Sequence, residues 1–383
     1  MSDSIRTTGR VATGIPGLDE VLHGGVPRGS LVLVEGRPGS GKTTFGLQCL
    51  IHGAAIGETC LFVTNAESPS QLEAIAASHE WDLTGVHMFE WAESPGASDA
   101  EPAEYTLFPE DEVEVGESLQ RLFAEMDRVK QSLLVIDTLS SLRGLAPTQA
   151  YHRRQMRRLR EALRRCGRTG LLLDDATRDE KGARSRTLAD ALIELRQIDV
   201  NYGADRRRLR VRKVRGSTYV SGAHDFSIVT GGLVVYPRLI AGKHASVSNG
   251  DPLASGNAAL DALSGGGLPR GSSTLIMGPA GIGKSTLATS YAVAAAAKGE
   301  RCLVLLFDEA VSTFLVRSRG LGLEIDALSS SGHLRYTHLD PAERSPGEIS
   351  HYVLEQVERE GVSVVVIDTL NGYLHSAVSE PDV

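Results

Sequence analysis

The sequence predicts an α/β fold with two related domains, each built on a mostly parallel central sheet flanked by helices. Three observations support this prediction. Short apolar runs alternate with helical patterns along the chain. A glycine-rich turn of one spacing follows an apolar run in each half. Residues 13–44 also align with residues 255–286 at a constant offset of 242 residues, which indicates a duplicated domain rather than a short solenoid repeat.

The first copy begins with the alternation that is typical of a parallel sheet. Apolar runs predict buried strands at 30–35, 59–64, 133–136 and 170–174. Helical patterns lie between and after them at 42–55, 68–79, 118–130 and 150–166, with Ser68 as a helix N-cap. After about residue 193 the alternation of strands and helices ends. Short strand patterns follow, which predict antiparallel hairpin strands at 209–216, 224–231 and 232–237, at the end of this domain.

The second copy repeats the first half of this pattern, with strands predicted at 273–278, 302–307 and 362–367. We expect a first domain at 1–240, a linker of small and polar residues at 241–254, and a second domain at 255–383. The second domain has roughly half the length of the first, so we expect it to be incomplete.

Composition excludes several classes of protein. The chain has 383 residues and a net charge of -8, which argues against a general nucleic-acid coat protein. Its four cysteines are scattered, without the paired spacing of a zinc ribbon or a disulfide scaffold. No stretch approaches the roughly 20 apolar residues that a membrane-spanning helix needs, and the first residues lack an apolar signal core. We therefore expect a cytoplasmic protein without a membrane segment.

Two phosphate loops match the pattern G-x-x-x-x-G-K-[ST], each between a predicted strand and a predicted helix. Glycines let the backbone N–H groups turn toward phosphate oxygens, and the helix N-terminus adds its positive dipole end. The lysine is expected to reach the β- and γ-phosphates of a nucleotide, ATP in this interpretation. The predicted nucleotide-binding residues are Gly36, Pro38, Gly39, Ser40, Gly41, Lys42, Thr43 and Thr44, and Gly278, Ala280, Gly281, Ile282, Gly283, Lys284, Ser285 and Thr286.

Acidic residues at strand ends complete the predicted site. Hydroxyls of Thr43 and Ser285 are expected to bind Mg²⁺, together with Asp137 and Asp368, which each end an apolar run followed by Thr-Leu. Hydrolysis also needs a group that polarises water near the γ-phosphate. The predicted candidates at the ends of the second strands are Glu67, Asp308 and Glu309.

Together these residues resemble the KaiC-like branch of the RecA-fold P-loop ATPases. The resemblance rests on the segment 13–29, the two phosphate loops and the strand-end acids, in tandem, and 105–108 and 371–374 resemble a bacterial subgroup. It implies hexameric rings with ATP bound between subunits. It also implies that Lys213 and Arg215, in Lys-Val-Arg-Gly-Ser, reach the γ-phosphate of a neighbouring subunit, where cations offset the charge of the transferring group.

Two departures from the family pattern bear on activity. The clock branch of the family carries adjacent glutamates after the second strand, whereas the first copy has Ala66 before Glu67. We therefore expect slow hydrolysis, or a nucleotide-bound assembly ring, in the first copy. The family's Lys-x-Arg-Gly-Ser/Thr sequence, here Lys213 to Ser217, is its finger motif. The second copy lacks the stretch that would carry its own finger motif and the autophosphorylated residues, so autokinase activity is not predicted.

Two other functions stay open from the sequence. Arginines are dense at 153–165 and 206–215, as in a RecA- or DnaB-like DNA-dependent ATPase, although no aromatic residues are interleaved for base stacking. In the first of these stretches Met156, Leu159 and Leu163 share one helical face, which leaves the arginines solvated or between subunits. The third function is a nucleotide-gated scaffold that docks a signalling protein with negligible hydrolysis.

Overall fold

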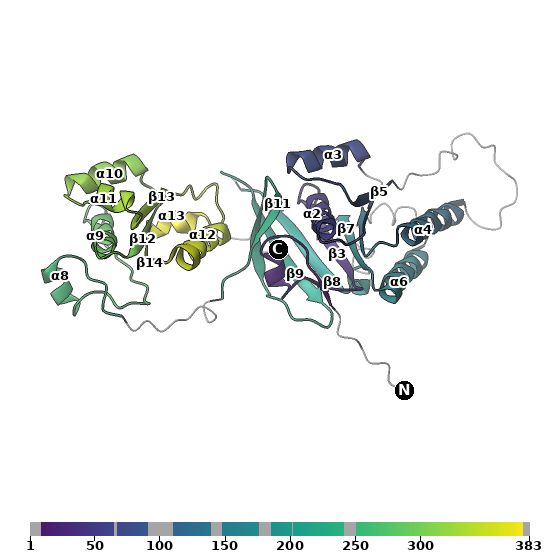
Figure 1. The fold of residues 1–383 in the computed structure, drawn as a ribbon, viewed down its shortest axis with the longest axis horizontal. Coiled ribbons are helices and arrows are strands. Elements are labelled where there is room, and N and C mark those ends of the chain that lie inside the picture. Colours follow the sequence, from purple (N-terminus) through teal and green to yellow (C-terminus); the bar gives the residue numbers. More distant parts are fainter. Residues whose placement is uncertain are drawn as a thin grey trace, which may run out of the picture. The chain divides into compact units, whose positions relative to one another are not determined.

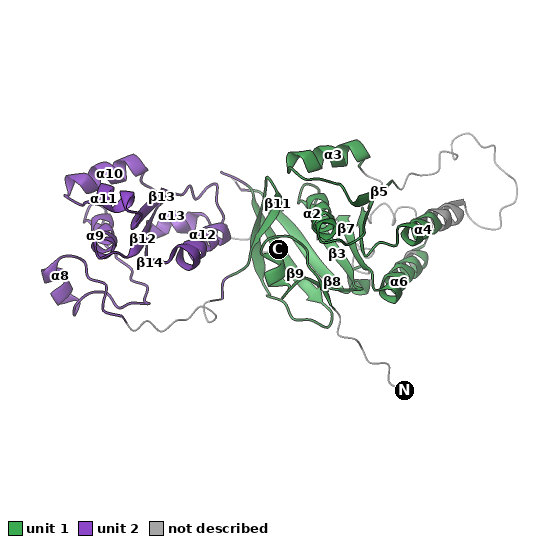
Figure 2. Cartoon of the chain, in the orientation of Figure 1, with its two compact units in different colours: residues 1–199, 205–238 green, residues 200–204, 239–383 purple. Residues whose placement is uncertain are grey.

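The computed structural model describes residues 9–64, 67–90, 110–138, 148–175, 185–200, 202–240 and 250–377. The chain divides into two compact units (Figure 2), one made of residues 1–199 and 205–238 and the other of residues 200–204 and 239–383. Each unit is described by itself below.

Unit 1 is built on a nine-stranded sheet in the order β11-β10-β9-β8-β3-β7-β6-β4-β5 (Figure 1). The strands from β8 to β5 in this order are parallel, and β9, β10 and β11 continue the sheet as antiparallel neighbours. The strands are β3 (Leu31–Gly36), β4 (Cys60–Thr64), β5 (Val86–Glu90), β6 (Leu133–Asp137), β7 (Thr169–Asp175), β8 (Ala191–Ile198), β9 (Arg206–Val214), β10 (Ala223–Val229) and β11 (Gly232–Tyr236). The parallel sheet and the terminal hairpin strands are thus confirmed, while β5 and β8 were missed by the sequence analysis.

Helices cover both faces of this sheet, and alternate residues of each strand face opposite layers. On one face α4 (Glu110–Val129) and α6 (Gln149–Cys166) pack against Leu33, Leu61 and Leu172. On the other face lies α2 (Lys42–Ala55), which begins and ends where the sequence predicts. Unit 1 also contains α1 (Leu18–Val21) and α3 (Pro69–Ser78). Ser68 caps α3 in a capping box with Gln71, as its residue type predicts.

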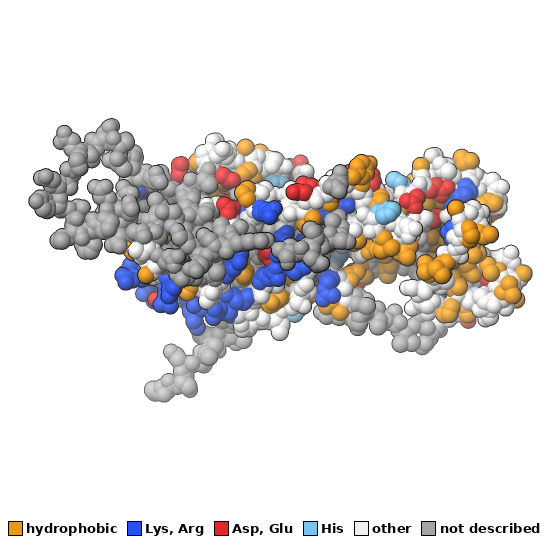
Figure 3. Space-filling model, turned by 180° about the vertical axis from the view of Figure 1, so that it is seen from behind, with side chains coloured by type: hydrophobic (Ala, Val, Ile, Leu, Met, Phe, Trp, Pro, Cys, Tyr) orange, Lys and Arg blue, Asp and Glu red, His pale blue; other side chains and the backbone are white. Residues whose placement is uncertain are grey.

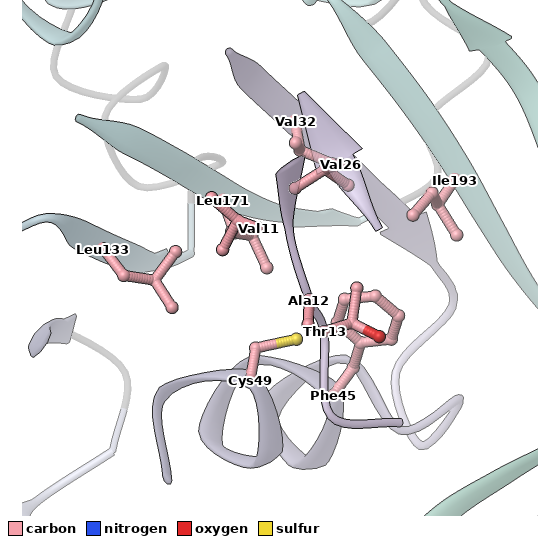
Figure 4. Close-up of a pocket in the computed structure, with 10 residues that line it drawn as sticks. All are labelled: Val11, Ala12, Thr13, Val26, Val32, Phe45, Cys49, Leu133, Leu171 and Ile193. Carbon is pink, nitrogen blue, oxygen red and sulfur yellow. The ribbon is translucent and has the colours of Figure 1, made fainter. Parts of the chain in front are cut away.

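The N-terminal segment closes the α2 side of unit 1. Strands β1 (Arg10–Val11) and β2 (Val26–Pro27) form a small antiparallel pair above α2. Figure 4 shows a cavity beneath them that faces Phe45 and Cys49 of α2. At about 10 Å³ it holds at most one water molecule, so it is a packing gap and not a ligand site. Burial raises the pKa of the Cys49 thiol well above its usual value, so this cysteine stays protonated.

Unit 2 contains a three-stranded parallel sheet in the order β13-β12-β14. Its strands are β12 (Arg301–Leu306), β13 (Leu334–His338) and β14 (Val362–Asp368). Its helices are α8 (Ala258–Leu263), α9 (Lys284–Ala297), α10 (Val311–Gly320), α11 (Ile325–Ser330), α12 (Pro346–Glu360) and α13 (Leu370–His375). These strands repeat the neighbouring trio β5-β4-β6 of unit 1, and α9 matches α2 in length and position after the loop.

The strand predicted at 273–278 is wrong, because these residues form no strand in unit 2. In unit 1 the corresponding strand, β3, is paired on both sides, with β7 and β8. The described part of unit 2 contains no strand in either of those two positions, so the segment has no neighbour to which its backbone could bond. Leu275 is consequently 62% exposed, whereas its counterpart Leu33 is fully buried.

The layered core predicts where truncation is most damaging. Leu172 lies in the centre of the sheet at 1% exposure, so Leu172→Ala should lower the free energy of unfolding of unit 1 by about 2–5 kcal/mol. The matched change Ile56→Ala, at a residue 59% exposed, should cost less than about 1 kcal/mol. Urea titrations of both variants measure the two losses, and equal losses would contradict this assignment of the core.

Candidate functional site

The two glycine-rich loops adopt the same backbone conformation. Gly39 and Gly41 have φ angles of 80° and 95°, and their counterparts Gly281 and Gly283 have 79° and 97°. These left-handed values favour glycine strongly, which explains its recurrence at this spacing. The second glycine of each pair is the N-cap of the following helix, and having no side chain it cannot accept a hydrogen bond from the first N–H groups of that helix. The first N–H groups of both helices therefore point outward without an intrahelical partner, as an anion-binding site requires.

The ammonium group of Lys42 is held inside the first loop. Its Nζ donates hydrogen bonds to the carbonyl oxygens of Gly36 at 2.9 Å and Arg37 at 3.1 Å. It also forms an ion pair with Asp175 at 3.1 Å. Lys42 is only 7% exposed, so its charge is directed into the cradle of the loop.

Asp175 is a site residue that the sequence analysis missed. It is the last residue of β7, which lies between β3 and β6, and its register partner on β3 is Gly36. The carboxyl ends of parallel strands are where α/β sheets bind ligands, so this position faces the phosphate loop. The same rule that selected Asp137 could have found Asp175, because both follow an apolar run.

The predicted metal ligands of the first copy come together. The Thr43 hydroxyl donates a hydrogen bond of 2.7 Å to Asp137 Oδ2, across the end of β7. A hydroxyl and a carboxylate are oxygen ligands that suit Mg²⁺, which binds proteins through one or two carboxylates and completes its shell with water and phosphate. In keeping with such an open site, the described residues hold no cluster of three or more histidine, cysteine or acidic side chains that could bind a metal alone.

Glu67 lies against the same pair of residues. Burial, with the Asp137 charge as the second cause, raises the pKa of Glu67 above its usual value, while the Thr43 hydroxyl acts in the opposite direction. Its Oε2 atom is buried and has no hydrogen-bond partner among the described residues. Burial also raises the pKa of Asp137. The site is therefore short of positive charge and can accept a cation or a proton. Ala66, the other residue of interest at this turn, lies outside the described residues.

The second copy repeats the metal pair with one difference nearby. Ser285 donates to Asp368 Oδ1 at 2.9 Å, and Lys284 donates to the carbonyl of Pro279 at 2.8 Å. Asp308 accepts a hydrogen bond of 2.5 Å from Thr369. Glu309, in contrast, is ion-paired to Arg317 of α10 at 2.7 Å. The predicted acids thus reach the site, but in this copy neither is without a partner.

Lys213 and Arg215 lie away from the phosphate loop of their own unit. Lys213 pairs with Leu192 of β8, whereas Gly36, at the start of the phosphate loop, pairs with Leu195 of the same strand. The three residues between these two pairs correspond to about 10 Å along the strands. Its Nζ donates to the carbonyl of Arg186 at 2.6 Å, and Arg215 donates to the carbonyl of Thr187 at 2.8 Å. Burial and the nearby Arg215 charge lower the pKa of Lys213.

The arginine-rich stretches differ in their surroundings. Met156, Leu159 and Leu163 of α6 are buried as expected, and the arginines at 153, 154, 157, 158, 164 and 165 are exposed. Figure 3 shows Lys and Arg side chains gathered on unit 1. Arginines of β9 are instead partly neutralised within the sheet, through pairs such as Arg208 with Asp225 and Arg212 with Glu194.

Comparison with known proteins gives consistent matches. A family model described as "ATPase: KaiC" matches residues 11–240 and 253–381. The "Circadian clock protein KaiC3" of Synechocystis sp. is 30% identical over 338 residues, which are 85% of this chain and 65% of that protein. The "Circadian clock protein KaiC2" of the same organism is 30% identical over 95% of this chain and 64% of its own length.

A more distant relative is the "Circadian clock oscillator protein KaiC" of Parathermosynechococcus lividus, 27% identical over 84% of this chain and 60% of its own. The chain thus spans less than two thirds of the length of these three relatives. Among the helices that the structure describes, none is long and apolar enough to cross a membrane.

The raised pKa of Glu67 predicts a pH-dependent stability. Because its folded pKa is raised, the unfolded chain ionises first, and the penalty develops as the pH rises from the unfolded to the folded pKa. Glu67→Gln should therefore raise the melting temperature of the nucleotide-free protein at pH 7. The gain should vanish below about pH 4, where both states are protonated. Thermal melts from pH 4 to 7 test this, and a gain that is equal at both ends would contradict it.

Proposed function

The chain belongs to the KaiC family of ATPases, and we propose that it binds Mg-ATP at both phosphate loops, assembles as a ring with ATP between subunits, and hydrolyses ATP slowly in a regulatory role. The observation that carries this proposal is the hydrogen bond between Thr43 and Asp137, repeated between Ser285 and Asp368. In each copy this hydrogen bond connects a loop suited to binding phosphates with a carboxylate suited to binding Mg²⁺.

Binding of the nucleotide depends on charge exchange at Lys42. In the proposed complex the β- and γ-phosphates replace Asp175 as the partner of the Lys42 ammonium, while backbone N–H groups from Gly39 onward cradle the phosphate oxygens. When bound, Mg²⁺ neutralises phosphate charge, and Thr43 with Asp137 would hold it. This charge is needed because Asp137 and Asp175 both interact with the single lysine Lys42, and Glu67 lies beside Asp137.

Glu67 is the residue that we assign to water activation in the first copy. Its carboxylate has an unused oxygen, and its raised pKa makes it a better proton acceptor than an exposed glutamate. It would orient a water molecule toward the γ-phosphate and hold the water's hydrogen. A single glutamate at this turn, with Ala66 before it, supports a slow rate.

The positions of Lys213 and Arg215 support the proposed ring. Their position along the sheet keeps Lys213 and Arg215 about 10 Å or more from the phosphate loop of their own unit. A second subunit is therefore the natural source of these cations for a bound γ-phosphate, where they would stabilise the transition state. The relatives named circadian clock proteins suggest a signalling role, and we propose a signalling protein as the partner of the assembled ring.

Loss of the loop lysine tests the nucleotide and the assembly together. Lys42→Ala should weaken ATP binding about tenfold or more, because the phosphates lose a charge-assisted hydrogen bond. The ATP-dependent rise in light-scattering mass should disappear in the same variant. Lys298→Ala, which removes an exposed lysine at the end of α9, should assemble as the unmodified chain does. Assembly of the Lys42→Ala variant with ATP would overturn the interfacial nucleotide, and assembly without measurable phosphate release would favour the scaffold function.

Mixing of two inactive variants tests the finger in trans. Arg215→Ala keeps an intact loop, and Lys42→Ala keeps an intact finger, so a mixed ring contains some interfaces with both parts. We expect each variant alone to lose about tenfold or more of its turnover and the mixture to recover part of it. Phosphate release at constant total protein measures the recovery. A mixture no faster than the average of its components would argue against a finger supplied by a neighbour.

A further inference from the structure

The equivalent glutamates of the two copies have different partners. Glu67 and Glu309 are related by the offset of 242 residues, and they follow the equivalent strands β4 and β12. Glu67 Oε2 is buried without a hydrogen-bond partner in the described structure. Both carboxylate oxygens of Glu309 are instead occupied by Arg317, whose Nε lies 3.2 Å from Oε1 and whose Nη2 lies 2.7 Å from Oε2.

The source of this difference is one position on the following helix. Arg317 lies on α10, and at the same offset the first copy has Ile75 on α3. Isoleucine has no donor, so the first copy cannot make the same pair. The surrounding loop conformation, the metal pair and the helix that follows the loop are otherwise shared by the two copies.

Arg317 is fixed by more than its acidic partner. Its guanidinium lies over the ring of the buried Phe314, 5.6 Å from the centroid, which adds a cation–π contact. Its Nη1 lies 3.5 Å from the hydroxyl of Thr286, the residue directly after the metal-binding Ser285. The side chains of Arg317 and Glu309 are only 25% and 22% exposed, so solvent screens this bidentate pair little.

We propose that Arg317 is a positioning residue that locks Glu309 out of water activation, so that the second copy holds nucleotide without turning it over. A carboxylate whose two oxygens both accept from a guanidinium cannot turn toward a water molecule without breaking that pair. Asp308, at the neighbouring position, is exposed and accepts a hydrogen bond from Thr369 with its Oδ2. The first copy, whose Glu67 keeps an unused oxygen, then carries the turnover. This inference rests on the proposed binding of Mg-ATP at both loops.

The test uses the full chain with its first copy silenced by Glu67→Gln, which leaves both phosphate loops intact. In this background Arg317→Ile installs the residue of the first copy. A general base typically contributes about a hundredfold or more, so a freed Glu309 should raise kcat for phosphate release by at least about tenfold. The Kd for Mg-ATP should change less than about threefold. Adding Lys284→Ala should abolish the gain, because the gain belongs to the second loop.

Two further variants separate positioning from a general loosening of α10. Arg319→Ile removes another arginine of the same helix, which pairs with Asp326 at 2.8 Å, and it should leave kcat at the background value. Arg317→Lys keeps a positive charge against Glu309 and should also keep turnover low. Thermal melts identify variants that fail to fold, and Arg317→Gln replaces Arg317→Ile if the isoleucine variant melts early.

The rates of these variants either support or overturn the proposed role of Arg317. A rise in kcat for Arg317→Ile alone supports the lock. An unchanged kcat in a folded variant that binds Mg-ATP overturns it, and so does an equal rise in Arg319→Ile. If the Glu67→Gln chain binds no Mg-ATP in calorimetry at either loop, the proposed function itself fails, and this result is distinguishable because it precedes any comparison of rates.

Discussion

The hydrogen bond between Thr43 and Asp137 is the contact on which the arrangement of unit 1 depends. The hydroxyl belongs to the first turn of α2, whereas the carboxylate ends β6, two positions away from β3 in the sheet. The bond therefore spans the end of β7 and requires three adjacent parallel strands to finish at the same edge of the sheet. It also requires α2 to lie over the sheet, which the apolar packing of Phe45 and its neighbours provides. Core packing thus fixes two polar groups that are far apart in sequence at a separation suited to one cation.

The same geometry leaves the site deficient in positive charge. Asp137 and Asp175 share one lysine, Lys42, and Glu67 lies beside Asp137. Burial raises the pKa of Glu67 and of Asp137 because their charges are poorly solvated. A stable core would not retain such a cluster for its own sake, since unpaired buried charges cost free energy. In the proposed complex, a divalent cation would take the carboxylates and the phosphates would take the lysine, so each charged group would exchange its partner.

How much of this could be predicted depends on whether the signal is local. The phosphate loops, α2 and the strand-end Asp137 are predicted from residue type and spacing over a few positions. The structure has α2 at Lys42–Ala55 and Asp137 at the end of β6, while phosphate binding by the loops stays a prediction. The half-buried β5 and the alternating β8 lack a continuous apolar run, so they were missed. The segment 273–278 has the apolar run of a strand, but a strand also needs neighbours, and pairing is not encoded locally. Asp175 was visible in the sequence at the end of an apolar run, yet its importance follows from the position of β7 between β3 and β6.

The duplication shows which features a phosphate loop can vary. The glycine angles of the two copies agree closely because backbone N–H groups must converge on the same oxygens, and no side chain can correct a misplaced backbone. The hydroxyl–carboxylate pair tolerates the exchange of Thr43 for Ser285, since only the oxygen takes part. The neighbouring helix is under neither constraint: Ile75 and Arg317 occupy one position without disturbing the loop. Because a long side chain there reaches the strand-end glutamate, a change outside the loop alters the electrostatics of the site and leaves its shape intact. When two duplicated sites share one loop conformation, we therefore expect their sequences to diverge first at neighbouring helix positions such as this one, and only later in the loops.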